Sequence, residues 1–217
     1  MKLVFRAASS RRRRPAIFLD RDGVINERVV GGYVTHWTEF RFLDGIVPVL
    51  RTLSRLHLPI IVVSNQSGVS KGLVGSRSLR HITTRFVDWL ASHGARIDAA
   101  YYCPHTAEQA CPCRKPKPGL LLSAAQDCRI DLSRSVLIGD ALTDVQAAVA
   151  AGCPGILLNA GSERILAFGH GSSLEEGSLR VPSDQPDIGP RARGWAIVEQ
   201  VADLPAKVAA ALNRVLP

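Results

Sequence analysis

The chemistry-bearing residues of this chain begin with Asp20 and Asp22, two carboxylates that stand one residue apart. They follow the apolar run 16–19 and precede Gly23. An apolar run that leads into a glycine turn is typical of a buried strand ending at a site. Both carboxylates could reach one ligand, but they repel each other unless a metal ion or a shared proton offsets their charge. The pattern favours a catalytic strand end, while a polar turn would use the same residue types.

Two further apolar runs also end in polar residues. Ser64 and Asn65 follow the second run, and Asp140 and Asp144 follow the third. Lys115 lies in the basic segment RKPKPG between them. Ligands of open α/β sheets bind at the carboxyl ends of the strands, so these groups are expected to meet at one edge. A carboxylate nucleophile, an acid, a hydroxyl, a cation and a magnesium ligand are the parts that metal-assisted phosphoryl transfer needs.

A cysteine-rich loop gives a second signal, because Cys103, His105, Cys111 and Cys113 fall within eleven residues. Three thiolates and an imidazole can surround tetrahedral zinc and leave no open position, so this zinc would be structural. The loop runs directly into the basic segment 114–117, which the metal would hold over the substrate. Unrelated free thiols in a loop are the alternative.

The elements that must position these groups alternate along the chain. We expect strands at 16–19, 58–63, before residue 102, and at 135–138, 155–158 and 195–198, and helices at 44–57, 76–93, 120–128, 144–151 and 204–215. This alternation predicts an α/β fold with a central parallel sheet flanked by helices. The irregular stretch 27–42 is interpreted as an excursion over the active edge, and the Gly-, Ser- and Pro-rich stretch 161–194 as a flexible loop.

Composition fits one globular domain over residues 15–217, because 217 residues with 46% hydrophobic content can bury a sizeable core. No apolar run approaches the roughly 20 residues of a membrane span. Residues 1–14 carry four arginines at 11–14 after the apolar residues, the wrong order for a secretory signal, and we expect a disordered basic arm. The odd count of five cysteines argues against a disulfide framework and favours the cytoplasm. The net charge of +8 suits phosphates or nucleic acid.

The motifs resemble those of the haloacid dehalogenase (HAD) superfamily of phosphatases, in order and in type. FLDRDG at 18–23 resembles the first motif, Ser64-Asn65 the second, Lys115 the third, and Gly139-Asp140 with Asp144 the fourth. The resemblance implies a three-layer Rossmann-like fold without a large cap domain. We expect a monomer, because no helical cap insertion is evident.

The resemblance also implies the roles of the residues. Asp20 would attack phosphorus to form an aspartyl-phosphate, and Asp22 would act as acid and then as base. Burial and the neighbouring carboxylates would help Asp22 to hold its proton in the free site. Ser64 and Lys115 would neutralise the phosphoryl oxygens. Magnesium would be bound by Asp20, Asp140 and the backbone carbonyl of Asp22.

Asp144 would lie in the next layer of the site, where it orients water or Lys115.

Zinc-loop members of the superfamily include phosphatases of histidinol phosphate and of D-glycero-D-manno-heptose 1,7-bisphosphate. The chain resembles the heptose enzymes at GYV (32–34), SNQSGV (64–69) and RKPKPGL (114–120). By that likeness the substrate-binding residues are Arg28, Tyr33, Asn65, Gln66, Ser67 and Arg114.

The choice of substrate depends on the charge near Arg114. A second phosphate suits a planar bidentate donor such as Arg114, whereas the amine of histidinol phosphate would need a carboxylate, for which Glu27 and Glu39 are the nearby candidates. We therefore predict the 7-phosphate of the heptose bisphosphate as the substrate, with histidinol phosphate as the alternative. A third reading, a DNA 3′-phosphatase or nucleic-acid-binding module, rests on the pI of 9.7 and the arginine run. Against it, the zinc loop lacks interleaved aromatic residues, so a small-molecule partner is expected rather than nucleic acid or a membrane.

Overall fold

The computed structural model describes residues 1–5, 12–159 and 195–213. These residues form one seven-stranded sheet in the order β1-β4-β3-β2-β5-β6-β7, in which only β1 runs antiparallel to its neighbour. The strands are β1 (Lys2–Val4), β2 (Ile17–Leu19), β3 (Ile60–Asn65), β4 (Ala99–Cys103), β5 (Val136–Gly139), β6 (Gly155–Leu158) and β7 (Trp195–Val198).

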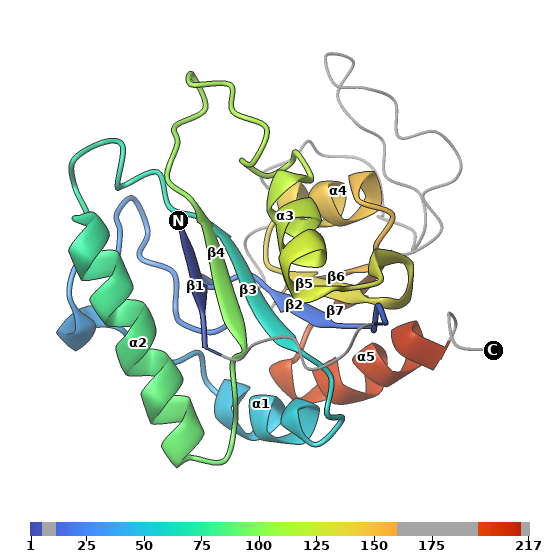
Figure 1. The fold of residues 1–217 in the computed structure, drawn as a ribbon. Coiled ribbons are helices and arrows are strands. Elements are labelled where there is room, and N and C mark those ends of the chain that lie inside the picture. The colour runs from blue at the N-terminus through green and yellow to red at the C-terminus, as the bar shows by residue number, and fades with distance from the viewer. Residues whose placement is uncertain (6–11, 160–194, 214–217) are drawn as a thin grey trace, which may run out of the picture.

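Helices cover both faces of this sheet (Figure 1). The α-helices are α1 (Ile46–Ser54), α2 (Ser76–Ser92), α3 (Gly119–Cys128), α4 (Leu142–Ala150) and α5 (Leu204–Asn213), with 3₁₀ turns η1 (Trp37–Glu39), η2 (Leu132–Arg134) and η4 (Val201–Asp203). Apolar side chains of α1, α2 and α5 pack with Ile17 and Leu19, whereas those of α3 and α4 pack with Phe18 on the opposite face. The expected three-layer fold is confirmed.

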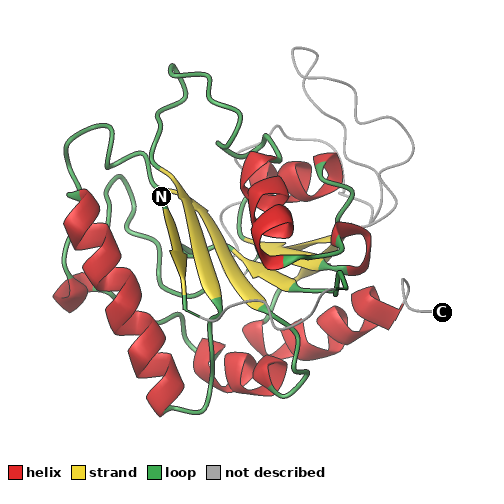
Figure 2. Cartoon of the chain, viewed as in Figure 1, coloured by secondary structure: helices red, strands yellow, loops and turns green. Residues whose placement is uncertain are grey.

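The central position of β2 explains its sequence. It lies between β3 and β5, and its three residues are fully buried because helices cover both of its faces. The amide of Asp20 continues the ladder by donating to the carbonyl of Ile138 at 2.8 Å. The carboxyl ends of β2, β3 and β5 are therefore neighbours, and the long loops that leave this edge gather at one end of the molecule (Figure 2).

The excursion after β2 is anchored at its far end by aromatic packing on α2. The ring of Phe40 stacks on Phe86 at 5.2 Å between centroids, and that of Phe42 lies 4.3 Å from Trp89. Closer to β2, the segment 29–32 is exposed, and Val30 retains 89% of its accessible surface. The expected irregular excursion thus has a fixed base and an exposed tip.

The N-terminus departs from the expectation of a disordered arm over residues 1–14. Lys2–Val4 form an edge strand that pairs with Ala99–Tyr101 of β4, and the ammonium of Lys2 forms an ion pair with Asp127 at 2.7 Å. Three residues are too few to show a strand period in the sequence, so this element was missed. Residues 6–11 and the expected loop 161–194 lie outside the described residues. Across the part of the chain that is described, we find no helix that combines the length and the apolar character of a membrane span.

Candidate active site

A cleft of about 600 Å³ opens at the carboxyl ends of β2, β3 and β5. It has carboxylates and Lys115 at its inner end and further cations toward the exposed segment 29–32. Its lining comprises Asp20, Asp22, residues 28–34, Ser64, Asn65, Ser67, Lys71, Leu73, Arg114, Lys115, Ala141, Thr143 and Asp144.

Lys115 forms the inner end of the cleft together with two carboxylates. Its ammonium lies 3.0 Å from Oδ1 of Asp20, contacts Oδ1 of Asp144, and donates to the carbonyl of Val63 at 2.9 Å. Burial would lower the pKa of Lys115, but the charges of Asp144 and Asp20 outweigh it and raise that pKa above its usual range. Burial raises the pKa of Asp144 to about 6, against the opposing charge of Lys115. Lys115 is therefore a fixed positive charge beside Asp20.

Asp22 has a different set of partners, although it is only two residues away. The guanidinium of Arg21, which is fully buried, donates to both carboxylate oxygens of Asp22 at 2.9 Å. Asn26 donates to Oδ1 at 2.9 Å, and Gln66 donates to Oδ2 at 2.6 Å. Burial would raise the pKa of Asp22, but Arg21 and these hydrogen bonds outweigh it and lower the pKa. The expectation that Asp22 holds a proton in the free site is therefore wrong, because Arg21 favours the carboxylate.

Asp140 lies beside the turn that follows β2. A Cβ atom on Gly23 would stand 1.8 Å from Oδ2 of Asp140, and Gly23 has a φ of +87°. Glycine thus meets two needs at this position, a left-handed backbone and room for the carboxylate. The other oxygen of Asp140, Oδ1, accepts from Nη2 of Arg28 at 2.5 Å.

The second motif has a structural task as well. The amide side chain of Asn65 donates to the carbonyl of Lys115 and accepts from its amide, both at 3.1 Å, so it fixes the backbone of Lys115. Gln66 is 2% exposed and does not line the cleft, since it donates to Asp22 and to Ser64. The structure thus gives Gln66 contacts with Asp22 and Ser64, and its contact with a substrate stays a prediction.

The outer end of the cleft is cationic. Arg114 lines it and donates to the carbonyl of His105 at 3.1 Å. Tyr33 shares a hydrogen bond of 3.1 Å with Ser67, and the ammonium of Lys71 lies 5.8 Å from the ring centroid of Tyr33. That hydrogen bond, assisted by Lys71 and Arg114, lowers the pKa of Tyr33.

Sequence reasoning missed Lys71 and Thr143, which also line the cleft. A lysine in a loop carries no spacing signal, and its position after the second motif was the only available indication. Thr143 lies in the first turn of α4, one residue before Asp144, so its placement follows only once that helix is located.

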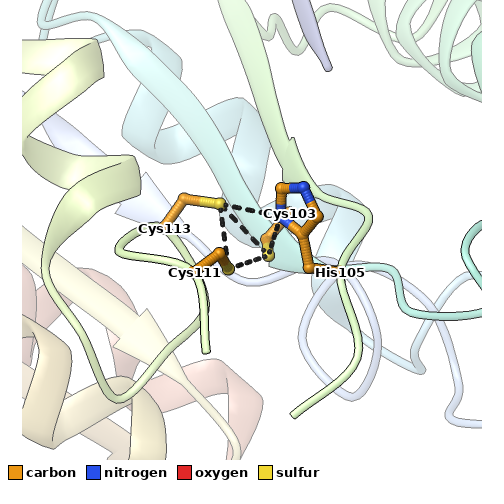
Figure 3. A group of neighbouring side chains, drawn as sticks. All are labelled: Cys103, His105, Cys111 and Cys113. Carbon is orange, nitrogen blue, oxygen red and sulfur yellow. Dashed lines mark hydrogen bonds between the residues drawn. The ribbon is translucent and has the colours of Figure 1, made fainter. Parts of the chain in front are cut away.

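The four residues of the cysteine loop converge (Figure 3). The three sulfur atoms of Cys103, Cys111 and Cys113 lie 3.3–3.5 Å apart, and Nδ1 of His105 lies 3.3 Å from Sγ of Cys113 and 3.6 Å from Sγ of Cys103. None of these three cysteines forms a disulfide in the structure described. Tetrahedral zinc with bonds of about 2.3 Å would separate its sulfur ligands by roughly 3.8 Å, so the cluster needs only a slight expansion to hold zinc.

Comparisons with known proteins agree with this geometry. A family profile described as HAD-hydrolase-like matches residues 112–173. The D-glycero-β-D-manno-heptose-1,7-bisphosphate 7-phosphatase of Yersinia pestis is 34% identical over 204 residues, which are 90% of this chain and 96% of that protein. The protein of the same name from Escherichia coli (strain K12) is 44% identical over 145 residues, 63% of this chain and 74% of its own. The chain belongs to the HAD-like phosphatase family.

A solved structure of a relative extends the likeness to the fold. The D,D-heptose 1,7-bisphosphate phosphatase of B. bronchiseptica, described as complexed with magnesium and phosphate, matches with a TM-score of 0.73 at 30% identity. The match covers 90% of this chain and 98% of that one. The family and the fold predicted from the motifs are both confirmed.

Members of this family use magnesium, and the described carboxylates suit that ion. Oxygen atoms of Asp20, Asp140 and Asp144 lie within 4.8 Å of one another, and magnesium prefers such hard oxygen ligands. The side chain of Asp22 is paired with Arg21 and does not belong to this group. The atom of Asp22 that is expected to bind magnesium is its backbone carbonyl oxygen. The residues present therefore fit a magnesium ion at the inner end of the cleft.

The Gly23–Asp140 contact yields a prediction for Gly23→Ala. The added methyl group must displace the carboxylate of Asp140, so we expect the affinity for magnesium to fall at least about tenfold, measured by calorimetry. Gly31→Ala is the matched control, because Gly31 also has a positive φ of +69° but has no atom within 4 Å of the added Cβ. Gly31→Ala should lose only roughly 1 kcal/mol of folding stability, because alanine is strained at a positive φ, and should keep its affinity for magnesium. Equal magnesium affinity in both variants would contradict the assignment.

The cysteine cluster yields a prediction for Cys111→Ser. Loss of one of four ligands should lower the zinc content and, because metal binding stabilises the fold, lower the Tm by about 6 °C or more. Metal analysis and thermal unfolding measure the two effects. Cys128→Ser is the control, because Cys128 lies outside the cluster and should retain its zinc. A variant with full zinc content would rule out Cys111 as a ligand.

Proposed function

We propose that this protein is a magnesium-dependent phosphatase that removes the 7-phosphate of D-glycero-D-manno-heptose 1,7-bisphosphate through an aspartyl-phosphate on Asp20. The observation that carries the proposal is the buried Lys115, 3.0 Å from Asp20 at the inner end of a cationic cleft. The choice of sugar is supported by the names of relatives 34–44% identical to the chain. Five free cysteines agree with a cytoplasmic enzyme, and we retain a monomer as the expected state.

Asp20 is the proposed nucleophile. One of its carboxylate oxygens forms a bond to phosphorus while the bond from phosphorus to the sugar oxygen breaks. Lys115 stays beside Asp20 through its contact with Asp144, so its charge can stabilise the negative phosphoryl oxygens without reorganisation. Ser64 is proposed to donate to another of these oxygens. Magnesium, bound by Asp20, Asp140 and the backbone carbonyl of Asp22, would supply charge neutralisation and orient the phosphoryl group.

Asp22 is the proposed acid and base. It donates a proton to the departing sugar oxygen and then accepts one from the water that attacks the aspartyl-phosphate and frees Asp20. Its low pKa in the free site suits the second step directly. For the first step, the negative charge of the arriving phosphate must raise that pKa, since a neighbouring like charge favours the protonated form.

The outer end of the cleft favours a second phosphate on the substrate. Lys71 and Arg114 lie there with the hydroxyl groups of Tyr33 and Ser67, a donor set suited to phosphate oxygens. Among the described lining residues the carboxylates are Asp20, Asp22 and Asp144, all at the inner end.

At the outer end, no described lining residue is a carboxylate that could pair with the amine of histidinol phosphate. Glu27 and Glu39, the sequence-based candidates for that partner, do not line the cleft, and Glu39 accepts hydrogen bonds from Thr35 instead. The charge of the cleft therefore supports the bisphosphate over the amine-bearing alternative. Phosphate release from the two compounds, assayed in parallel, should show a clear preference for the heptose bisphosphate.

Asp20→Asn tests the nucleophile. The amide cannot form the acyl phosphate, so we expect kcat to fall by about a thousandfold or more with the fold unchanged. Phosphate release measures the activity, and acid quenching with labelled substrate should trap label on the wild-type chain alone. Asp88→Asn, an exposed position on α2, is the matched control and should retain full activity. Turnover by Asp20→Asn close to the wild-type rate would refute covalent catalysis.

Arg114→Ala tests the second phosphate site. Losing a bidentate donor should lower kcat/KM for the bisphosphate about 10- to 100-fold and leave the heptose 7-monophosphate less affected. Arg114→Lys retains the charge without the planar pair of donors and should lie between. Equal losses for both substrates in Arg114→Ala would assign the residue to the shape of the loop rather than to the second phosphate.

A further inference from the structure

Arg28 occupies an unusual position for a residue in an exposed loop. Its guanidinium lies 2.5 Å from Oδ1 of Asp140, whose side chain is only 3% exposed, while Arg28 itself remains 38% exposed. Burial would lower the pKa of Arg28, but Asp140, with smaller contributions from Asp20 and Asp144, raises it. Arg28 is thus within the field of all three clustered carboxylates.

Gly23 and Arg28 lie on either side of the carboxylate of Asp140. Oδ2 of Asp140 is packed against the turn, because a Cβ on Gly23 would overlap it at 1.8 Å. Oδ1 is the oxygen that Arg28 holds. A magnesium ion bound by Asp140 would bring its positive charge close to that of Arg28, which already pairs with this carboxylate.

The charges at the inner end of the cleft explain why Arg28 is present. Asp20, Asp140 and Asp144 bring three negative charges within 4.8 Å of one another. Within the described part of the chain, ion pairs join them to Lys115 and Arg28. Lys115 is 3% exposed and is also held by the carbonyl of Val63, so it cannot leave readily. Arg28 is 38% exposed, so it can move away from the carboxylates.

We propose that Arg28 is an internal counter-cation of the metal-free site, which magnesium displaces from Asp140 when it binds. This inference rests on the proposed function for the presence of magnesium. It adds that the chain itself competes with the ion, so that the metal affinity is set by a loop residue as well as by the ligands.

Displacement of Arg28 has a consequence for the segment 29–32. The chain before it is held by the pairing of Glu27 with Arg41, and the chain after it is anchored through Phe40 on α2. Between these points the segment 29–32 is exposed and contains Gly31 at a positive φ. The Arg28–Asp140 ion pair connects its start to the inner end of the cleft, while Tyr33 and the buried Val34 hold the chain that follows it. Since this segment lines the cleft, metal binding would loosen the entrance through which the substrate arrives.

Calorimetric titration of magnesium into the full-length, zinc-loaded, magnesium-free protein tests the inference. Arg28→Gln removes the competing cation, so we expect its magnesium Kd to be about three- to tenfold lower than that of the wild type. Lys71→Gln is the matched control, because it removes one positive charge from the same cleft without a contact to the three carboxylates, and its Kd should change less than about twofold. Arg28→Lys should lie between wild type and Arg28→Gln.

Hydrogen exchange gives a readout that does not depend on affinity. Magnesium should speed exchange of the backbone amides of residues 28–32 in the wild type, and in Arg28→Gln these amides should exchange rapidly with or without the ion. The amides of β3 should be unaffected in both.

The outcomes separate the two proposals. A Kd in Arg28→Gln equal to or higher than that of the wild type, or an equal gain in Lys71→Gln, overturns the counter-cation while the phosphatase proposal stands. Absence of magnesium binding in every variant at millimolar concentration overturns both. Tighter binding in Arg28→Gln alone, with faster exchange in the wild type on adding magnesium, supports the inference.

Discussion

The site depends on one buried ammonium group, that of Lys115. Removing a charge of this kind from water costs several kcal/mol, and the cost is tolerated only when carboxylates and hydrogen-bond acceptors surround the charge. Asp20, Asp144 and the carbonyl of Val63 provide that surrounding. The dependence is mutual, because Asp20 and Asp144 would be a pair of buried like charges without Lys115. Asp20, Lys115 and Asp144 are therefore one unit, in which each buried charge depends on the others.

Lys115 comes from a segment without regular structure, yet its ammonium group must be positioned as accurately as a residue in a strand. Residues 104–118 contain no helix or strand, so backbone ladders cannot position Lys115. Asn65 at the end of β3 fixes its peptide group from one side, and Gly119 allows the loop to fold onto itself, since a Cβ there would stand 2.4 Å from the carbonyl of Pro112. The cysteine cluster draws the start of this loop and Cys113 together. The cluster is thus coupled to the chemistry through geometry, at a distance from the reacting atoms.

The residue types at three strand ends were sufficient to predict which groups meet. The strands β3, β2 and β5 are parallel neighbours, so their carboxyl ends lie at the same edge of the sheet. The protonation state predicted for Asp22 was wrong, and pairings between distant residues were not predicted. The state of Asp22 depends on Arg21 folding back onto it and on Gln66, 44 residues away. Arg28 and Asp140 are 112 residues apart, and no local pattern connects them. Lys71 and the short strand β1 were missed because a single loop lysine and a three-residue strand carry no periodic signal.

The repulsion between Asp20 and Asp22 is resolved in a way that the sequence analysis did not consider. A shared proton or a metal ion was expected to offset their charge, but the structure gives each carboxylate its own buried cation, Lys115 for Asp20 and Arg21 for Asp22. Separate counterions allow two adjacent carboxylates to have different surroundings, as two different roles in one reaction require. Arg21 lies between them in sequence, and its guanidinium donates to both carboxylate oxygens of Asp22. The fully buried Arg21 thus gives Asp22 a counterion of its own, separate from the Lys115 that pairs with Asp20.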